Sequence, residues 1–282
     1  MAENTQIQTP SFTFVNPPPV KNYPLYCWHI IAKILSFTLF GLGTVFISII
    51  AFPVIKLLFW NKEKFRKAGH HFISWAFRFF VCFMTVLQAS RLTTPDKKKF
   101  RSLKSSIIVA NHPSLLDVVM LISLLPDADC IVNSALAGKN IVQIIVNHLY
   151  IPNSASHEEL MERCTKSLKS GSCLIIFPEG TRSLPEGQNK FKKGAARVAL
   201  ASSCPIVPVY IGGNDKRGLR KHDSMFKYNT RNCYHYDLHI KESLLPEGFA
   251  GEPEPAAAKH MTEKLQEILS DANNRDFIEN YR

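Results

Sequence analysis

The sequence predicts an α/β protein in which a mostly parallel sheet is flanked by helices and is preceded by an N-terminal membrane helix or a two-helix membrane motif. Three observations support this fold class. Short apolar runs alternate with helix-like segments after residue 105, an uncharged apolar stretch lies near the N-terminus, and the excess positive charge lies beside that stretch. Strands that alternate with helices of about 10–20 residues are typical of parallel sheets.

The charge of the chain is concentrated in its first third. The 282 residues carry a net charge of +11, and residues 1–105 contain 14 Lys and Arg against 3 Asp and Glu. Residues 106–282 contain 20 of each sign. Because the excess lies with the apolar stretch, it favours a membrane surface over nucleic acid as the partner. Net charge alone suggests nucleic-acid binding as an alternative. The sequence has no zinc-finger, helix-turn-helix or aromatic-basic strand pattern to support it.

The first 55 residues predict a lead-in and a membrane helix. Residues 1–25 are rich in proline and predict a flexible segment. Residues 34–55 carry no charge, and as a helix they would extend about 33 Å, enough for a bilayer core of about 30 Å. More basic residues follow this stretch than precede it, which predicts that its C-terminal flank is cytoplasmic. Gly41, Gly43 and Pro53 also allow a broken helix that enters only one leaflet, so both topologies stay open.

A second apolar helix is expected over residues 68–87. It contains Arg78, whose charge is costly in mid-bilayer, so we expect this helix to pack beside the first at the membrane surface. A buried helix of the soluble domain is the alternative. The basic stretch at 97–104 predicts attraction to anionic lipid, or else a solvated linker. The expected organisation is a flexible lead-in over 1–25, membrane-associated helices over 26–90 and a globular domain over 91–282.

The rest of the chain predicts the sheet and its helices. The expected strands cover residues 106–110, 130–133, 172–177, 206–211 and 234–241. The expected helices cover residues 113–125, 157–169, 194–201 and 256–272. The seven cysteines are widely spaced without a Cys-x-x-Cys pair, which predicts buried free thiols in a reducing compartment.

The first cluster of reactive residues is Asn-His-Pro-Ser-Leu-Leu-Asp at 111–117. Pro113 suits the first position of a helix and biases His112 toward an extended conformation outside it. The ring of His112 can then fold back toward Asp117, which we expect on the second helical turn. A carboxylate on one ring nitrogen leaves the other free to take a proton. A capping histidine and an unrelated aspartate would give the same pattern.

Two further clusters contain groups that suit an anionic substrate. Phe-Pro-Glu-Gly-Thr-Arg at 177–182 follows an apolar strand, and strand ends in α/β sheets are where ligands bind. There Arg182 can grip a phosphate with two parallel hydrogen bonds, and Gly180 permits close backbone approach. Residues 189–196 contain three lysines at the start of a predicted helix. They either bind an anion at the helix N-terminus or form a solvated run of charge. Residues 205–211 form an apolar strand that suits a pocket wall.

Taken in this order, the clusters resemble the PlsC-type glycerolipid acyltransferases, the 1-acylglycerol-3-phosphate (lysophospholipid) acyltransferase family. The resemblance covers roughly residues 100–245, and its sharpest parts are Asn-His-x4-Asp and Phe-Pro-Glu-Gly-Thr-Arg, about sixty residues apart, with Phe-Lys-Lys-Gly-Ala after them. It implies an O-acyltransferase of membrane phospholipid or glycolipid biosynthesis. It also implies N-terminal helices that dock on the membrane holding the substrates.

The resemblance implies a role for each matching residue. His112 is expected to remove the proton of the acceptor hydroxyl, and Asp117 to orient His112 and balance its charge. The acceptor-binding residues are expected to be Glu179, Gly180, Thr181 and Arg182. The acyl donor is expected to be acyl-CoA or acyl-carrier protein, the acceptor a membrane lyso-lipid, and the transfer direct, without an acyl-enzyme on Ser114. No cofactor and no metal are expected, and the catalytic domain is expected on the cytoplasmic face of the cytoplasmic membrane.

One segment departs from the family pattern. Where family members carry Lys-x-Glu-Leu and a later Arg, this chain has Asn-Ser-Ala-Leu at 133–136 and Asn-His at 147–148, with Lys139 as a compensating cation. Two alternatives follow. The acceptor can be another lyso-lipid, such as lyso-ornithine lipid or a glycolipid precursor, or the chain can be a non-catalytic membrane-docked lipid-binding protein.

Two smaller features leave alternatives open. His235, Asp237 and His239 share one face of a predicted strand, which is either a polar strand face or, less in keeping with the pattern, a metal site. The basic segment 215–231 can contact lipid headgroups or an acidic carrier protein, or it can be solvated.

Overall fold

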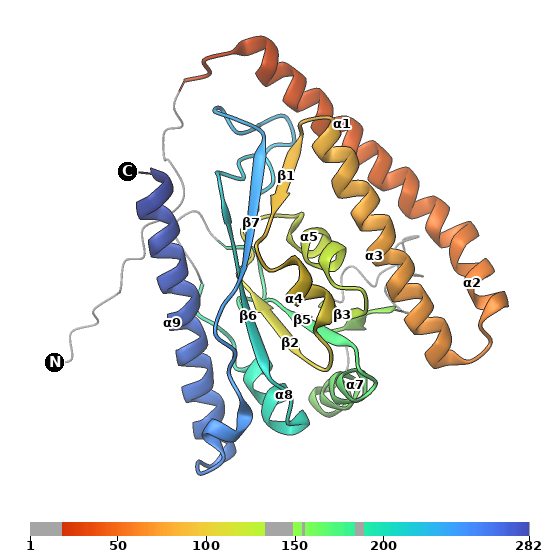
Figure 1. Ribbon diagram of the computed structural model, residues 1–282, viewed down its shortest axis with the longest axis vertical. Helices are drawn as coiled ribbons and strands as arrows, with labels where there is room; N and C mark the ends of the chain where they lie inside the picture. The colour runs from red at the N-terminus through yellow and green to blue at the C-terminus, as the bar shows by residue number, and fades with distance from the viewer. Residues whose placement is uncertain (1–18, 133–148, 154–155, 184–188, 282) are drawn as a thin grey trace.

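The computed structural model describes residues 19–132, 149–153, 156–183 and 189–281. Within these ranges the centre of the molecule is a seven-stranded sheet (Figure 1). Its order is β1-β7-β6-β2-β5-β3-β4. The strands are β1 (Ser90–Thr93), β2 (Ile107–Ala110), β3 (Ala128–Val132), β4 (Ile151–Pro152), β5 (Cys173–Ile176), β6 (Ile206–Gly213) and β7 (Tyr234–Ile240).

The sheet is mostly parallel, as the sequence predicts. Strand β2 lies at its centre, with Val109 opposite Ile176 of β5 on one side and Pro208 of β6 on the other, both in parallel register. The antiparallel pair is β6 with β7. The carboxyl ends of β2 and β5 therefore meet at the same edge, where the first two sequence clusters follow them.

Helices cover both faces of the sheet and form a three-layer α/β sandwich. One face packs against α3 (Lys62–Val86), α4 (Lys97–Ser102) and α5 (Asp117–Leu124), and the other against α7 (His157–Lys169), α8 (Gly194–Ser202) and α9 (Glu254–Tyr281). The alternation along β2 separates the two cores, with Ile108 and Ala110 in the first and Ile107 and Val109 in the second. The predicted fold class is confirmed.

The N-terminal apolar region forms a helical hairpin. Helix α1 (Tyr23–Phe46) begins after Asn22, whose side chain accepts a hydrogen bond from Leu25 N at 3.0 Å. A π-helical turn, η1 (Ile47–Ala51), joins it to α2 (Phe52–Leu58). Because Pro53 has no N–H, the π-helical turn before it accommodates the interrupted hydrogen-bond ladder. Asn61 then caps α3, which returns beside α1 and α2 (Figure 1).

The expected apolar helices are present but longer. The segment Tyr23–Leu58 is long and apolar enough to cross a membrane by length and composition, and little of it is buried. Helix α3 begins at Lys62, six residues before the predicted start at residue 68. Arg78 lies on its exposed side, while Phe80 and Met84 are buried. Most of the predicted lead-in, residues 1–18, lies outside the described residues.

Several elements differ from those expected. Strands β1 and β4 are not among the expected strands, and β1 spans the expected domain boundary at residue 90. The prediction that a helix begins at Pro113 is wrong, because α5 begins at Asp117. The Asp117 side chain accepts hydrogen bonds from Ser114, and this folds residues 113–116 into a turn ahead of the helix.

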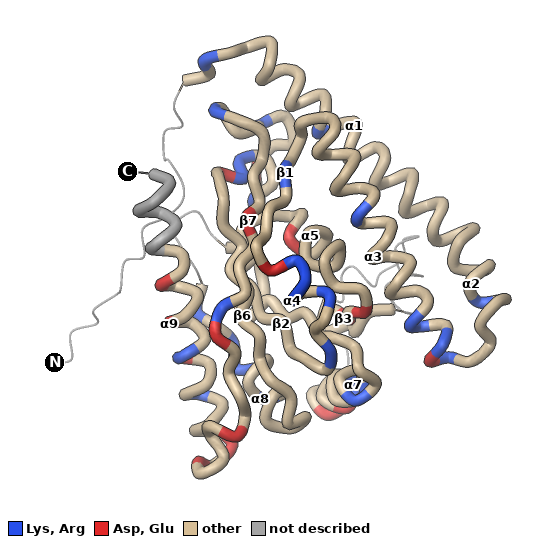
Figure 2. The backbone as a smooth tube through the Cα atoms, in the orientation of Figure 1, with Lys and Arg blue, Asp and Glu red and all other residues tan. Residues whose placement is uncertain are grey.

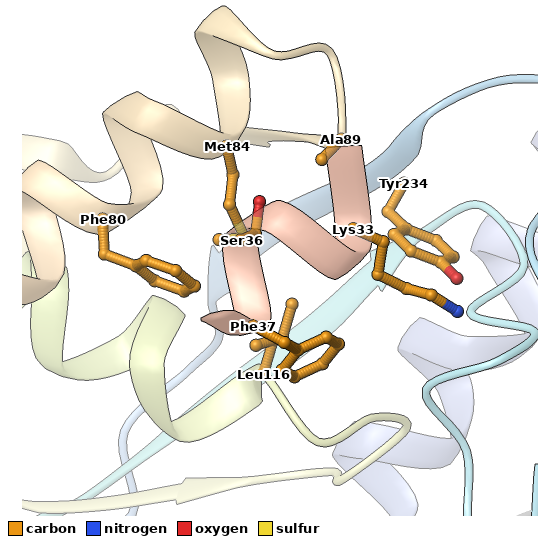
Figure 3. Close-up of a pocket in the computed structure, with 8 residues that line it drawn as sticks. All are labelled: Lys33, Ser36, Phe37, Phe80, Met84, Ala89, Leu116 and Tyr234. Carbon is orange, nitrogen blue, oxygen red and sulfur yellow. The ribbon is translucent and has the colours of Figure 1, made fainter. Parts of the chain in front are cut away.

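The hairpin packs directly against the α/β domain. Figure 3 shows side chains of α1 and α3 facing Leu116 of the 113–116 turn and Tyr234 of β7 across a small cavity. The cavity is lined by Lys33, Ser36, Phe37, Phe80, Met84, Ala89, Leu116 and Tyr234. Its volume of about 10 Å³ is enough for a single water molecule, so the hairpin and the domain are closely packed here.

Candidate active site

The backbone after β2 is fixed to the neighbouring strand by Asn111. Its amide nitrogen donates to Ile211 O at 3.0 Å, and its amide oxygen accepts from Ile211 N at 2.8 Å. The buried side chain thus continues the ladder to β6 beyond the last residue of β2. As a result the next residue, His112, is held at the carboxyl end of the central strand.

His112 and Asp117 form the pair that the sequence predicts. His112 Nδ1 lies 2.7 Å from Asp117 Oδ2. The Asp117 side chain is fully buried, whereas 17% of the His112 side chain is exposed. Because the carboxylate only accepts, it holds the proton on Nδ1 and leaves the Nε2 lone pair free. No group in the described part of the chain hydrogen-bonds to Nε2.

A buried hydroxyl chain supports Asp117 from behind. Ser114 donates to the carboxylate through its backbone N–H at 2.7 Å and through its hydroxyl at 2.6 Å. The Ser114 hydroxyl also lies 2.8 Å from the Tyr236 hydroxyl, and burial raises the pKa of Tyr236 well above its usual range. Tyr236 therefore stays protonated and donates to Ser114, which in turn donates to Asp117. With its hydroxyl occupied in this way, Ser114 is not placed to act as a nucleophile.

The segment after β5 lies directly against His112. The Phe177 ring stacks on the His112 ring with centroids 4.1 Å apart and planes inclined by 24°. The backbone N–H of Ser183 donates to His112 O at 2.8 Å. The fold therefore brings together the two clusters that are about sixty residues apart in the sequence.

Glu179 organises this segment from a buried position. One carboxylate oxygen accepts from His112 N at 3.3 Å and from the Ser183 hydroxyl at 2.6 Å. The other accepts from the backbone and side-chain nitrogens of Asn189, both at 2.9 Å. Both oxygens are thus used within the protein, and these contacts tie three loops together. The predicted role of Glu179 in acceptor binding stays a prediction.

The next three residues line the same side of the site. Gly180 has φ of +69°, and a Cβ there would lie 2.6 Å from Lys192 Nζ, so the lysine side chain passes over the glycine. Thr181 and Arg182 are partly exposed. Arg182 Nη1 donates to Leu219 O at 3.1 Å, which holds the guanidinium at the rim. Lys192 over Gly180 and Arg182 at Leu219 O thus give the segment after β5 two positive charges, an arrangement that suits a phosphate.

Several sequence expectations fall elsewhere. The departure from the family pattern at 133–136, Lys139 and residues 147–148 lie outside the described residues. His235, Asp237 and His239 of β7 form a polar strand face, because Thr93 of β1 bonds to His235 and Asp237, and His239 bonds to Asp237 at 2.7 Å. Within the residues that the structure describes, no group of three metal-ligating side chains is found.

A second buried histidine forms a network away from the site. His70 of α3 contacts Asp127 Oδ1 through Nδ1 at 2.6 Å and Leu149 O through Nε2 at 3.0 Å. Burial opposes its protonation, but hydrogen bonds to Asp127 and Asp129 outweigh burial and raise the pKa of His70 to about 9. Arg66 also contacts Asp129 at 3.0 Å. This network joins the hairpin to the start of β3.

Fold and site together define a class of protein: an α/β sandwich with a histidine–aspartate pair and a cationic turn at the carboxyl edge of its sheet. Comparison with known proteins agrees. Residues 91–212 match the family model described as Acyltransferase.

The individual relatives sharpen this assignment. The chain is 28% identical over 208 residues to a chloroplastic 1-acyl-sn-glycerol-3-phosphate acyltransferase of Arabidopsis thaliana, covering 69% of this chain and 54% of that protein. A probable 1-acyl-sn-glycerol-3-phosphate acyltransferase of Mycoplasma pneumoniae is 31% identical over 121 residues, covering 39% and 46%. The chain spans about half the length of such curated relatives. The resemblance to the 1-acylglycerol-3-phosphate acyltransferase family is therefore confirmed.

A solved structure has the same fold. The crystal structure of the 1-acyl-sn-glycerophosphate acyltransferase PlsC from Thermotoga maritima superposes with a TM-score of 0.65, covering 89% of this chain and 96% of that one. Sequence identity between the two is 21%, so this likeness supports the architecture.

Proposed function

We propose that this protein is an O-acyltransferase that moves a fatty acyl group from a thioester to the hydroxyl of a membrane lyso-lipid. The observation that carries this proposal is His112, whose Nδ1 is held by the buried Asp117 and whose backbone carbonyl accepts a hydrogen bond from Ser183, the residue after Arg182. The 1-acyl-sn-glycerol-3-phosphate acyltransferases among its relatives make 1-acylglycerol-3-phosphate the expected acceptor.

In the proposed reaction His112 acts as the general base. Nε2 takes the proton of the acceptor hydroxyl while that oxygen attacks the thioester carbonyl carbon. The C–S bond then breaks, and the proton passes from the imidazolium to the departing thiolate. Asp117 stabilises the imidazolium that forms between these steps. The acyl donor, acyl-CoA or acyl-carrier protein, is a co-substrate, and side chains of the protein supply the rest without a cofactor.

In the proposed complex the acceptor phosphate lies on the cationic rim. Arg182 would contact it with the guanidinium N–H groups that Leu219 O does not use. Lys192, which passes over Gly180, would supply the second charge, and the Thr181 hydroxyl a further donor. Glu179 would position these residues through its bonds to the protein.

We propose that the hairpin docks on one leaflet rather than crossing the bilayer. Helix α1 contacts the domain, since the His29 ring stacks on Tyr228 and Lys33 donates to Lys227 O at 2.5 Å. At the other end, Arg66 and His70 contact Asp129 and Asp127 beside β3. A hairpin that crossed the membrane would pull this domain into the hydrocarbon, where its polar loops would lose water.

The exposed apolar face of α1 and α2 would then lie in the cytoplasmic leaflet, with the catalytic domain in the cytoplasm where the thioester donors are made. This topology is tested by labelling a cysteine introduced at residue 21 or at residue 64, in inverted membrane vesicles, with the exposed Cys27 and Cys82 of the full chain replaced by serine. Both positions are expected to react from the cytoplasmic side. Protection of either one until the vesicles are opened would contradict docking on one leaflet.

The acceptor is tested with purified protein in mixed micelles. Oleoyl-CoA or oleoyl-carrier protein is supplied with 1-acylglycerol-3-phosphate, lyso-phosphatidylethanolamine or lyso-ornithine lipid, and products are identified by mass spectrometry. Diacylglycerol phosphate is the expected product. If an acceptor without a phosphate is turned over faster than 1-acylglycerol-3-phosphate, that acceptor is the substrate and the proposed acceptor is wrong. Absence of transfer in every combination would favour the non-catalytic lipid-binding protein.

A further inference from the structure

A second cavity lies away from His112, between the start of α1 and the 229–232 turn that leads into β7. Its volume is about 450 Å³, which is in the size range of small-molecule sites. Lys21 and Arg231 line it from opposite elements, together with His29, Asn229 and Thr230. Among the described residues that line it, none carries a carboxylate and two, Lys21 and Arg231, carry a positive charge.

The wall on the turn side is held rigidly. Asn229 is buried, donates to Asp215 O at 2.9 Å and accepts from Arg231 N at 2.8 Å. The adjacent Tyr228 is fully buried, and its hydroxyl bonds to Ala89 O, at the start of β1. The backbone that carries Arg231 is therefore fixed to the sheet before any ligand arrives, which lowers the entropy cost of binding.

The opposite wall contains the largely buried side chain of His29. His29 of α1 is 4% exposed and stacks on Tyr228 with ring centroids 5.0 Å apart. Within the described residues no group hydrogen-bonds to its ring nitrogens. An acceptor oxygen of a ligand in the cavity would give the imidazole N–H a hydrogen-bond partner.

The position of the cavity indicates where the ligand comes from. Tyr23 and Trp28, near the start of α1, are 67% and 42% exposed, and such aromatic side chains concentrate at the membrane interface. The loop before β7 is joined to α1 by the hydrogen bond from Lys33 to Lys227 O. Two apolar side chains of this loop, Met225 and Phe226, are exposed. Figure 2 shows basic residues at the start of α1 and in this loop. With the hairpin docked on one leaflet as proposed above, the cavity would lie at the level of the lipid headgroups.

We propose that this cavity binds the phosphate of an anionic phospholipid headgroup, at a site separate from the acceptor site at His112. Lys21 and Arg231 would contact the phosphate, and His29 would donate a hydrogen bond to one of its oxygens. The lipid tails would lie along the exposed side of α1 beside Phe226. A membrane lipid bound here would fix the orientation of the hairpin on the bilayer.

The test uses the full chain in dodecyl maltoside micelles, with thermal unfolding as the readout. Dioctanoyl phosphatidylglycerol is expected to raise Tm, because a ligand that binds the folded state stabilises it. Dioctanoyl phosphatidylcholine is expected to give a smaller shift. Inorganic phosphate at matched ionic strength is expected to give none. A shift with inorganic phosphate equal to that with the lipid would overturn the lipid assignment.

Matched variants locate the site. K21E/R231E is expected to weaken phosphatidylglycerol binding at least tenfold, and the milder K21Q/R231Q several-fold. K166E/K264E changes the net charge by the same amount as K21E/R231E, at exposed positions of α7 and α9. Its affinity for phosphatidylglycerol is expected to stay within twofold of that of the native chain. Equal weakening in K166E/K264E would reduce the effect to general charge and refute the site.

Arg182→Ala separates this proposal from the acyltransferase proposal. It is expected to leave the phosphatidylglycerol shift intact, and loss of the shift in this variant would assign the lipid to the acceptor site instead. K21E/R231E is expected to retain acyl transfer in micelles without anionic lipid. Because the binding test does not use activity, it remains decisive if no acyl transfer is found.

Discussion

Replacing Asp117 by asparagine separates the charge of this side chain from its role as an acceptor. In the structure Oδ2 accepts both from His112 Nδ1 and from the Ser114 backbone N–H, whereas Oδ1 accepts only from the Ser114 hydroxyl. The amide oxygen of the introduced asparagine should therefore take the Oδ2 position. Its NH2 group should face the Ser114 hydroxyl, which can rotate to accept it.

This orientation predicts a moderate loss of activity. The proton stays on His112 Nδ1, so Nε2 remains a base, and the charge that stabilises the imidazolium is what is lost. A hydrogen bond to a charged group contributes about 1–2 kcal/mol more than a neutral one, which corresponds to a fall in kcat of about 5- to 30-fold. Asp117→Ala also removes the acceptor and should cost about 10²–10⁴, the usual contribution of a general base.

The assay is acyl transfer with saturating thioester and acceptor, combined with nitrogen NMR of labelled histidine to read the tautomer. A loss in Asp117→Asn as large as that in Asp117→Ala, with the proton on Nε2, would refute the reasoning. Tyr236→Phe supplies an internal check. It should lower stability by about 1–3 kcal/mol more in the Asp117→Asn background, because the Ser114 hydroxyl then has no acceptor.

Three further predictions concern the rim, the glycine and the buried network. Arg182→Lys keeps a charge but loses the planar pair of donors, so KM for a phosphate-bearing acceptor should rise about tenfold with kcat nearly unchanged, as steady-state kinetics would reveal. Gly180→Ala should destabilise the fold by about 1–2 kcal/mol in urea unfolding, since its φ of +69° strains alanine while the flexible Lys192 can move aside. Because the pKa of His70 is raised to about 9 from an unfolded value near 6.5, its stabilising contribution, on the order of 3 kcal/mol, is complete below about pH 6.5 and is lost as pH rises through 9. Urea unfolding at pH 6.5 and 9.5 should reveal this loss in the native chain, and His70→Phe should abolish it; an equal pH dependence in both proteins would exclude His70 as the source.

The strands that the sequence predicts best are those buried on both sides. The runs at 106–110, 172–177 and 206–211 are almost wholly apolar between turn residues, and each expected boundary lies within two residues of the observed one. Strand β1 has a polar pattern, directly follows a helix and pairs with β7 about 140 residues later, so no local signal predicts it. Helix α5 begins late because a side-chain bond from Ser114 to Asp117 competes with the helix that Pro113 favours.

The candidate site is predictable only where its residues give a local signal in the sequence. His112, Asp117 and the 177–182 segment stand out locally, because their residue types cluster within a few positions. The supporting residues do not. Tyr236 reaches Ser114 from 122 positions away, and Asn111 bonds to Ile211 across the sheet. Phe177 is part of a motif, but its stacking on His112 depends on β2 and β5 being neighbours.

The central claim is that His112 is the base for acyl transfer to a lipid hydroxyl. Single-turnover transfer of a labelled oleoyl group from oleoyl-CoA to 1-acylglycerol-3-phosphate tests it most directly, with native protein and His112→Ala compared in the same micelles. The native protein should form diacylglycerol phosphate without a labelled acyl-enzyme, and His112→Ala should be slower by about 10²–10⁴ while still binding membranes. Transfer by His112→Ala at the native rate, or a labelled covalent intermediate on the protein, would contradict the mechanism.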